Sequence, residues 1–295
     1  MESVKIAKRT NVKKLFRPAS TKHWALFCMS AKGLVVGLLA IGLLAGCGTL
    51  PNGRGWGQDA TLFPGWQRIG RAARNAALAP ETWAPVAAAL VLQIDDWDEE
   101  ISEWASDNTP LFGSQEDAEQ ASDYLREATG AAYLITALAT PSGEDPKQWS
   151  VAKLKGIGIG AAAMTLAHET TELLKDTTDR TRPDESDDRS FPSGHASSAA
   201  GFATLGRKNL QSLSLTKRNR TLLSIGFTTL AAGTAWARVE AKRHHPSDVL
   251  VGYALGHFIS AFVNDAFLGL DQAQGPQLTI KPSRNCVIVG IRLVY

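Results

Sequence analysis

The stretch from Lys175 to Asp248 constrains the fold more than any other part of the sequence. It contains three clusters of charged and imidazole side chains, and each cluster borders an apolar segment with helical periodicity. The clusters are Lys175–Pro183, Pro192–His195 and Ala237–Asp248. Residues so far apart in the chain meet only if several helix ends are brought together. The sequence therefore predicts an all-α protein in which a helical bundle folds these side chains around a single site.

The clusters supply the groups that a site for a tetrahedral anion requires. Arg182 and Arg238 are forked donors that stay charged at any relevant pH, and Lys175 adds a point charge. Ser193 and Gly194 stand where a helix is expected to begin, so their N–H groups and the helix dipole favour an anionic oxygen. Gly194 has no Cβ, which allows the backbone to approach closely. We predict that these five residues bind phosphate.

The three clusters resemble the signature of the type 2 phosphatidic acid phosphatase superfamily, which also includes class A acid phosphatases and vanadium haloperoxidases. That signature reads Lys-x6-Arg-Pro, Pro-Ser-Gly-His and Ser-Arg-x5-His-x3-Asp. The chain matches all three parts in order, across about residues 84 to 268, and departs at Ala237, where the family has Ser. The resemblance implies a helical bundle of the acid phosphatase and haloperoxidase type.

The resemblance also implies catalytic roles. His244 would attack phosphorus to form a phosphohistidine, His195 would protonate the leaving oxygen, and Asp248 would hold the His244 imidazole. Taken alone, Asp248 is also explained as a charge that stabilises a helix start. The family's phosphatase chemistry uses no metal or other cofactor, so vanadate is expected to inhibit. In a haloperoxidase the same residues would hold vanadate as the cofactor.

The N-terminus has the pattern of a lipoprotein signal peptide. A basic region precedes the uncharged run Gly33–Gly46, which is too short to span a bilayer. The run ends in Leu44-Ala45-Gly46-Cys47, which resembles a lipobox, so Cys47 is predicted to be acylated. A plain membrane anchor is the alternative. Gly48 after the cysteine resembles outer-membrane sorting, which applies only if the cell has two membranes.

Net charge excludes one class of partner. The formal charge of the chain is +2, but residues 1–46 hold eight Lys or Arg and one acid, so the remainder has 23 basic and 28 acidic residues. An acidic remainder gives no electrostatic reason to expect nucleic-acid binding. The densest acidic patch, residues 95–103, has the carboxylates of a metal site, but the family's chemistry uses no metal, so a metal is disfavoured there.

Periodicity predicts the helices individually. They cover about residues 67–77, 84–104 with a possible break, 116–140, 147–176, 195–212, 217–237 and 246–268. Small residues across Gly156–Ala163 predict that the fourth of these lies at the centre of the bundle. His168 lies seven residues before Lys175, on nearly the same face of that helix, so it could border the site. A buried core histidine is the favoured interpretation. The charge-free runs are short for membrane spans, which favours a soluble domain held to the membrane by lipid.

The C-terminus changes to alternating residues. Leu278–Lys281 and Val287–Tyr295 flank a turn, which predicts a small β-hairpin, and Cys286 would lie beside the second strand. The expected division is a signal peptide (1–46), a tether and loop (47–83), a helical phosphatase domain (84–270) and a hairpin (271–295). The sequence does not determine the oligomeric state.

Three functions remain open from the sequence. The first is a metal-independent phosphatase in the cell envelope, facing the periplasm or exterior, which acts on phosphorylated lipids or small phosphomonoesters. The second is a vanadium-dependent haloperoxidase. The third is a non-catalytic envelope lipoprotein that retains a phosphate-binding site, for which the Ala237 departure gives slight support.

Overall fold

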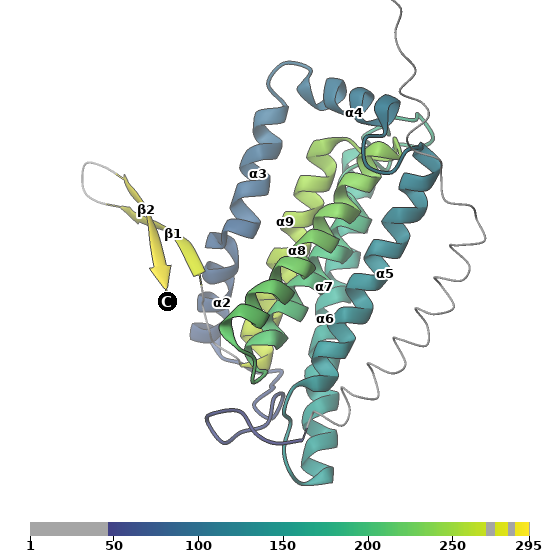
Figure 1. Cartoon of the computed structure of the whole chain (residues 1–295). Helices are drawn as coiled ribbons and strands as arrows, with labels where there is room; N and C mark the ends of the chain where they lie inside the picture. Colours follow the sequence, from purple (N-terminus) through teal and green to yellow (C-terminus); the bar gives the residue numbers. More distant parts are fainter. Residues whose placement is uncertain (1–46, 270–274, 283–286, 295) are drawn as a thin grey trace, which may run out of the picture.

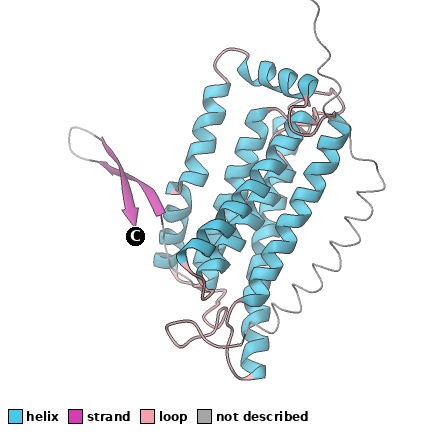
Figure 2. Ribbon diagram, viewed as in Figure 1, coloured by secondary structure: helices cyan, strands magenta, loops and turns pink. Residues whose placement is uncertain are grey.

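The computed structural model describes residues 47–269, 275–282 and 287–294, with side chains described as far as residue 269. The predictions for the signal peptide and for Cys286 lie outside these residues. In the described part the helices are α2 (Trp66–Leu78), α3 (Pro80–Leu92), α4 (Trp97–Asn108), α5 (Gln115–Ala139), α6 (Pro146–Thr178), α7 (Gly194–Gln211), α8 (Lys217–Glu240) and α9 (Pro246–Val263), followed by a π-helical turn, η1 (Asn264–Leu268). The all-α prediction is confirmed (Figures 1 and 2).

Local signals in the sequence define the helix ends. Ser114, Asp145 and Thr216 cap α5, α6 and α8, and each side chain accepts a hydrogen bond from an N–H of the first turn. Pro146 and Pro246 occupy the first position of their helices, where a missing N–H costs nothing. The predicted break between residues 84 and 104 separates α3 from α4. These caps explain why the helix ends lie close to the positions predicted from the sequence.

Helix α7 lies at the centre of the bundle and contacts α5, α6, α8 and α9. Its closest neighbour is α9, because two glycines let the backbones meet. A Cβ on Gly252 would lie 2.4 Å from the Ser193 carbonyl oxygen, and one on Gly256 would lie 2.0 Å from that of Ser197. The crossing therefore fixes the start of α7 against the first turns of α9.

Helix α6 lies at the side of the bundle, so the prediction that it forms the centre is wrong. Its glycines serve other contacts: Gly156 receives the ring of Trp56, and Gly160 receives the hydroxyl end of Tyr133. The opposite face of α6 is exposed, including Leu154, which is 71% exposed. Small residues indicate close packing, but they do not indicate which helix is central.

The segment that follows Cys47 is docked onto the bundle. Gly48 pairs with Gly143 through two backbone hydrogen bonds, and Trp56 is 1% exposed against the N-terminal half of α6. The Lys153 amine donates to three carbonyl oxygens at the end of α5, including that of Thr140 at 2.6 Å. Cys47 itself is exposed. Cys47 thus lies at the end of the bundle where α6 begins.

The predicted hairpin is present at the C-terminus. Strands β1 (Gly275–Pro282) and β2 (Val287–Val294) pair antiparallel, with Gly275 opposite Val294 and Pro282 opposite Val287. The hairpin lies beside α2 and α3, away from α5 and α6 (Figure 1). It therefore takes no part in the arrangement of the three polar clusters.

Candidate active site

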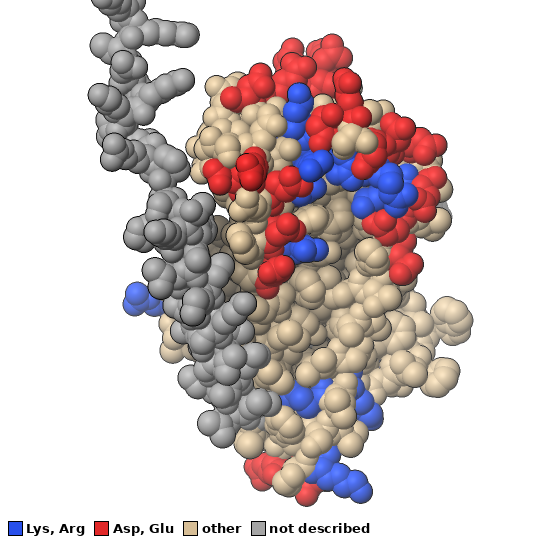
Figure 3. Space-filling model, turned by 90° about the vertical axis from the view of Figure 1, so that its right-hand side faces the viewer, with Lys and Arg blue, Asp and Glu red and all other residues tan. Residues whose placement is uncertain are grey.

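The three clusters meet at one end of the bundle. Lys175 is in the last turn of α6, Arg238 is in the last turn of α8, and His195 is in the first turn of α7. His244 precedes α9, and Asp248 is in its first turn. Figure 3 shows Lys and Arg side chains gathered among acidic ones at this end, above a middle region with few charged residues. Cys47 lies at the opposite end of the bundle, where α6 begins.

His244 is held in a single orientation. The imidazole is 2% exposed, and its Nδ1 lies 2.6 Å from the carbonyl oxygen of Ser190. A carbonyl oxygen only accepts, so Nδ1 carries the proton and Nε2 keeps its lone pair. Burial lowers the pKa of His244 to about 4, and the positive charges of Arg238 and Arg182 act in the same direction. The ring is therefore neutral at pH 7, the form that a nucleophile requires.

Asp248 does not hold His244 as directly as predicted. Its Oδ2 lies 3.8 Å from Nδ1, beyond hydrogen-bond distance. The same oxygen accepts from the Ser190 hydroxyl at 2.5 Å and from the His245 N–H at 2.9 Å. Burial alone would raise the pKa of Asp248, but contacts with His244, Arg180 and Ser190 hold it below its usual range. Asp248 thus positions the Ser190 segment, whose carbonyl orients the imidazole, and it also caps α9.

Arg180 and Asp98 form an ion-pair network that the sequence did not reveal. Arg180 donates to Asp248 Oδ1 and to Asp98 Oδ2, each at 2.7 Å. Asp98, in α4, is 1% exposed and also accepts from the N–H and hydroxyl of Ser247. One member of the acidic patch therefore joins α4 to the start of α9. No local pattern marks Arg180, which falls inside the first cluster but outside its motif.

Arg182, Arg238 and Arg243 concentrate positive charge beside His244. Arg238 is 6% exposed, and within the described part of the chain its buried Nε has no hydrogen-bond partner. Burial lowers the pKa of Arg238 to about 10, and the charges of Arg182 and Arg243 contribute to the decrease. Arg182 donates to Asp187 at 2.6 Å and to the carbonyl of Arg243 at 3.3 Å. This mutual repulsion favours a bound anion.

Arg243 was not predicted from the sequence. It forms two hydrogen bonds of 3.0 Å with Glu119 and one of 2.9 Å with Asp184. Glu119 is on α5, so Arg243 joins that helix to the loop before α9. It stands next to His244 in sequence, but only this pairing across the bundle indicates a role.

The turn before α7 provides fewer N–H groups than expected. The N–H of Ser193 donates to the carbonyl of Asp248 at 3.0 Å, so it is not free to bind an oxygen, contrary to the prediction. The first backbone hydrogen bond of α7 runs from the Ser197 N–H to the Ser193 carbonyl. The N–H groups of Gly194 and His195 therefore belong to the first turn, which has no partners within the helix. Lys175 Nζ would lie 3.5 Å from a Cβ on Gly194 and pairs with Glu172 at 2.7 Å.

His195 is more accessible than His244. Its side chain is 25% exposed, and Nε2 lies 2.8 Å from Oδ1 of Asp123 on α5. Burial lowers its pKa to about 4, and the nearby charge of Arg238 also lowers it, whereas Asp123 raises it. The charge of Arg238 thus lowers the pKa of both imidazoles. Asp123 belongs to none of the three motifs, and only the packing of α5 against α7 identifies it as the partner of His195.

The family model for the PAP2 superfamily matches residues 157–268. These residues include every part of the three clusters. The matched segment is thus similar to the PAP2 superfamily. No curated protein sequence matches the chain.

One solved structure is similar to this chain. It is the crystal structure of the first transmembrane PAP2-type phosphatidylglycerolphosphate phosphatase from Bacillus subtilis, with 22% identity and a TM-score of 0.47. The match covers 65% of this chain and 94% of that one. In the described residues, one helical segment, Pro246–Leu268, has the length and composition of a membrane span, and 67% of its most apolar window is buried inside the fold.

Proposed function

We propose that the protein is a metal-independent phosphatase that hydrolyses phosphomonoesters or lipid phosphates through a phosphohistidine at His244. One observation supports this most directly. The Ser190 carbonyl fixes the proton on His244 Nδ1, which leaves Nε2 as a nucleophile beside the buried Arg238. A neutral imidazole next to fixed positive charge is suited to attack an anionic phosphate group.

The reaction takes two steps. In the first, His244 Nε2 bonds to phosphorus while the ester P–O bond breaks, and His195 gives a proton to the leaving oxygen. In the second, water attacks phosphorus, His195 takes a proton from that water, and the P–N bond breaks to release phosphate. Arg182, Arg238 and Lys175 bind the equatorial oxygens, whose charge is spread in the transition state.

His195 must be protonated in the first step and neutral in the second, and its low pKa favours the neutral form. A phosphate dianion beside the imidazole favours its charged form and raises its pKa, which opposes the effect of Arg238. Asp123 supports the same protonated form through its hydrogen bond. The substrate thus helps to protonate the acid that its own leaving group needs.

The proposed location is the cell envelope. Acylation of Cys47 would attach the chain to a membrane, the outer one if the cell has two, with the helical domain facing the periplasm or exterior. The docked segment after Cys47 supports an attachment fixed relative to the bundle, since Gly48 pairs with Gly143. Mass spectrometry of the intact protein from cells, compared with a Cys47→Ser variant, tests the acylation.

Hydrolysis of p-nitrophenyl phosphate in EDTA tests the reaction itself. We expect EDTA-resistant activity, inhibition by orthovanadate, and acid-labile phosphate on the protein that is lost in His244→Ala. Arg74→Ala is the control because Arg74 is exposed on α2, outside the site. Wild-type activity in His244→Ala would overturn the proposal. Oxidation of halide by peroxide with added vanadate would instead assign a haloperoxidase, and binding of phosphorylated lipid without turnover would assign a non-catalytic protein.

A further inference from the structure

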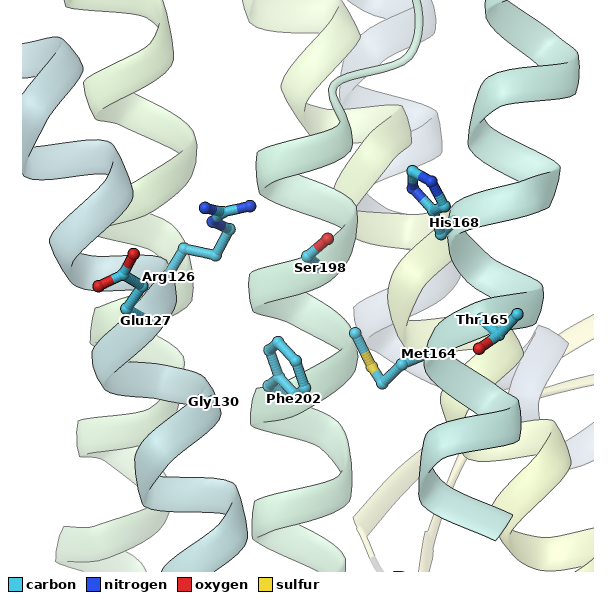
Figure 4. Close-up of a pocket in the computed structure, with 8 residues that line it drawn as sticks. All are labelled: Arg126, Glu127, Gly130, Met164, Thr165, His168, Ser198 and Phe202. Atoms are coloured by element: carbon cyan, nitrogen blue, oxygen red, sulfur yellow. The ribbon is translucent and has the colours of Figure 1, made fainter. Parts of the chain in front are cut away.

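A cleft of about 500 Å³ opens beside the site, between α5, α6 and α7. Ser198 and Phe202 of α7 form its floor, and Arg126 of α5 and His168 of α6 stand on opposite sides (Figure 4). Its volume is within the range of small-molecule binding pockets. His168 is exposed here, so its interpretation as a core histidine is wrong.

Each of the three helices leads from the active site into this cleft. On α7, Ser198 follows His195 by one helical turn, and Phe202 follows by another. On α5, Arg126 follows Asp123, the partner of His195, by three residues. On α6, which runs the other way, His168 precedes Lys175 by two turns. The cleft therefore extends from the side of His195 along the axis of the bundle.

The lining changes character along this direction. The side chains nearer to the site are polar, namely Arg126, Ser198 and His168 (Figure 4). Farther along, Phe202 and Met164 are apolar, the Phe202 ring lies against Gly130, and Thr165 and Glu127 complete the lining. A Cβ on Gly130 would lie 3.3 Å from the Phe202 ring. A ligand matched to this lining has a polar linkage next to the reacting phosphate and an apolar chain beyond it.

Arg126 supplies a donor that the protein itself does not satisfy. Its Nε is buried and, in the described part of the chain, has no hydrogen-bond partner. Its Nη2 reaches Asp123 only at 3.4 Å. The guanidinium end of Arg126 points toward Ser198 in the cleft, where its terminal N–H groups can donate to an acceptor on a ligand (Figure 4). The acceptor would sit near the bond that His195 protonates.

We propose that this cleft binds the leaving group of the substrate, and that Arg126 recognises an oxygen acceptor close to the scissile bond. The inference rests on the proposed function. The substrate class is an amphiphile with a terminal phosphate, an acceptor within a few atoms of it and an apolar chain that contacts Met164 and Phe202. An ester carbonyl or a second phosphate group would both provide the acceptor.

Four substrates separate these features in the full-length protein in detergent. They are p-nitrophenyl phosphate, dodecyl phosphate with a chain only, dioctanoyl phosphatidate with ester carbonyls, and farnesyl diphosphate with a second phosphate. Thr165→Trp should narrow the cleft from its exposed side on α6. We expect it to lower kcat/KM for the three chain substrates by about tenfold or more and to spare p-nitrophenyl phosphate. Leu166→Trp, on the adjacent exposed position, is the control.

Arg126→Gln tests the acceptor. We expect kcat/KM to fall by about tenfold for whichever acceptor substrate fits, relative to dodecyl phosphate, because only that contact is lost. Arg74→Gln, at an exposed position of α2, is the control. An equal loss for all four substrates would show that Arg126 acts through Asp123 and His195 and would overturn its assigned role.

The two proposals fail in different ways. If the unmodified protein hydrolyses none of the four substrates, the proposed function is wrong. If it hydrolyses them and Thr165→Trp affects chain substrates no more than p-nitrophenyl phosphate, only the leaving-group site is wrong. Folding of each variant is checked by its urea unfolding midpoint.

Discussion

His244 and His195 each lie near a carboxylate, but their surroundings differ. His244 is 2% exposed, and its neighbour Asp248 is fully buried and bonded on both oxygens. His195 is 25% exposed at its side chain, and its partner Asp123 is 49% exposed. A nucleophile benefits from a fixed ring, whereas a proton donor must reach both substrate and water. The two regions thus show how burial separates two roles of one residue type.

Replacing each histidine by Asn should give the largest difference between the regions. His244→Asn removes the nucleophile and should abolish hydrolysis of every substrate. His195→Asn should slow alkyl phosphates by about 10²–10⁴-fold, because an alkoxide leaves poorly without a proton. It should slow p-nitrophenyl phosphate far less, since nitrophenolate is a stable leaving group. Steady-state kinetics with both substrates measure this, and an equal loss for both in His195→Asn would contradict its role as a proton donor.

The buried network beneath His244 should be far more sensitive than a comparable surface network. Arg180→Met leaves Asp98 and Asp248 buried without their cation, so we expect a loss of about 3–5 kcal/mol in unfolding free energy. Arg189→Met also breaks two ion pairs, with Glu172 and Asp176, but these are exposed and should matter little. Urea unfolding compares the two. Similar losses would mean that burial does not distinguish these networks.

A third histidine separates the effect of burial from that of catalysis. His257 is 6% exposed, its Nδ1 lies 2.8 Å from the Thr204 hydroxyl, and burial lowers its pKa to about 4. In the unfolded chain the His257 imidazole binds a proton as the pH falls below about 6.5, whereas in the folded protein it stays neutral down to about pH 4. The stability that this group contributes is therefore fully present above pH 6.5 and is lost as the pH falls toward 4.

His257→Gln should remove part of that loss. We expect the decrease in unfolding free energy between pH 7 and pH 4 to shrink by about 1–3 kcal/mol in this variant. His168→Gln, at an exposed position, should leave the decrease unchanged. Urea unfolding at pH 7, 5.5 and 4 provides the measurement. A pH dependence that is the same in His257→Gln and the unmodified protein would show that His257 does not take up a proton on unfolding.

The motif residues and their main partners differ in how visible they are in the sequence. Lys175, Arg238 and His244 fall at recognisable spacings next to helix ends. Asp98, Arg180 and Asp123 do not, because each one acts through a partner on another helix or loop. Asp98 even belongs to an acidic patch whose other members give no hint of its burial. Ser190 contributes a backbone carbonyl, which any residue type would supply.

The sequence by itself determined the helices, the hairpin and the residues that gather at one end of the bundle. Periodicity, caps and motif spacing are local patterns, so they can be recognised in the sequence without knowledge of the fold. Only the tertiary structure decided that α7 rather than α6 is central, that the Ser193 N–H is occupied, and that Ser190 rather than Asp248 bonds to His244. These outcomes depend on which backbones and side chains pack together across the bundle, and residues far apart in the chain compete for the same partners.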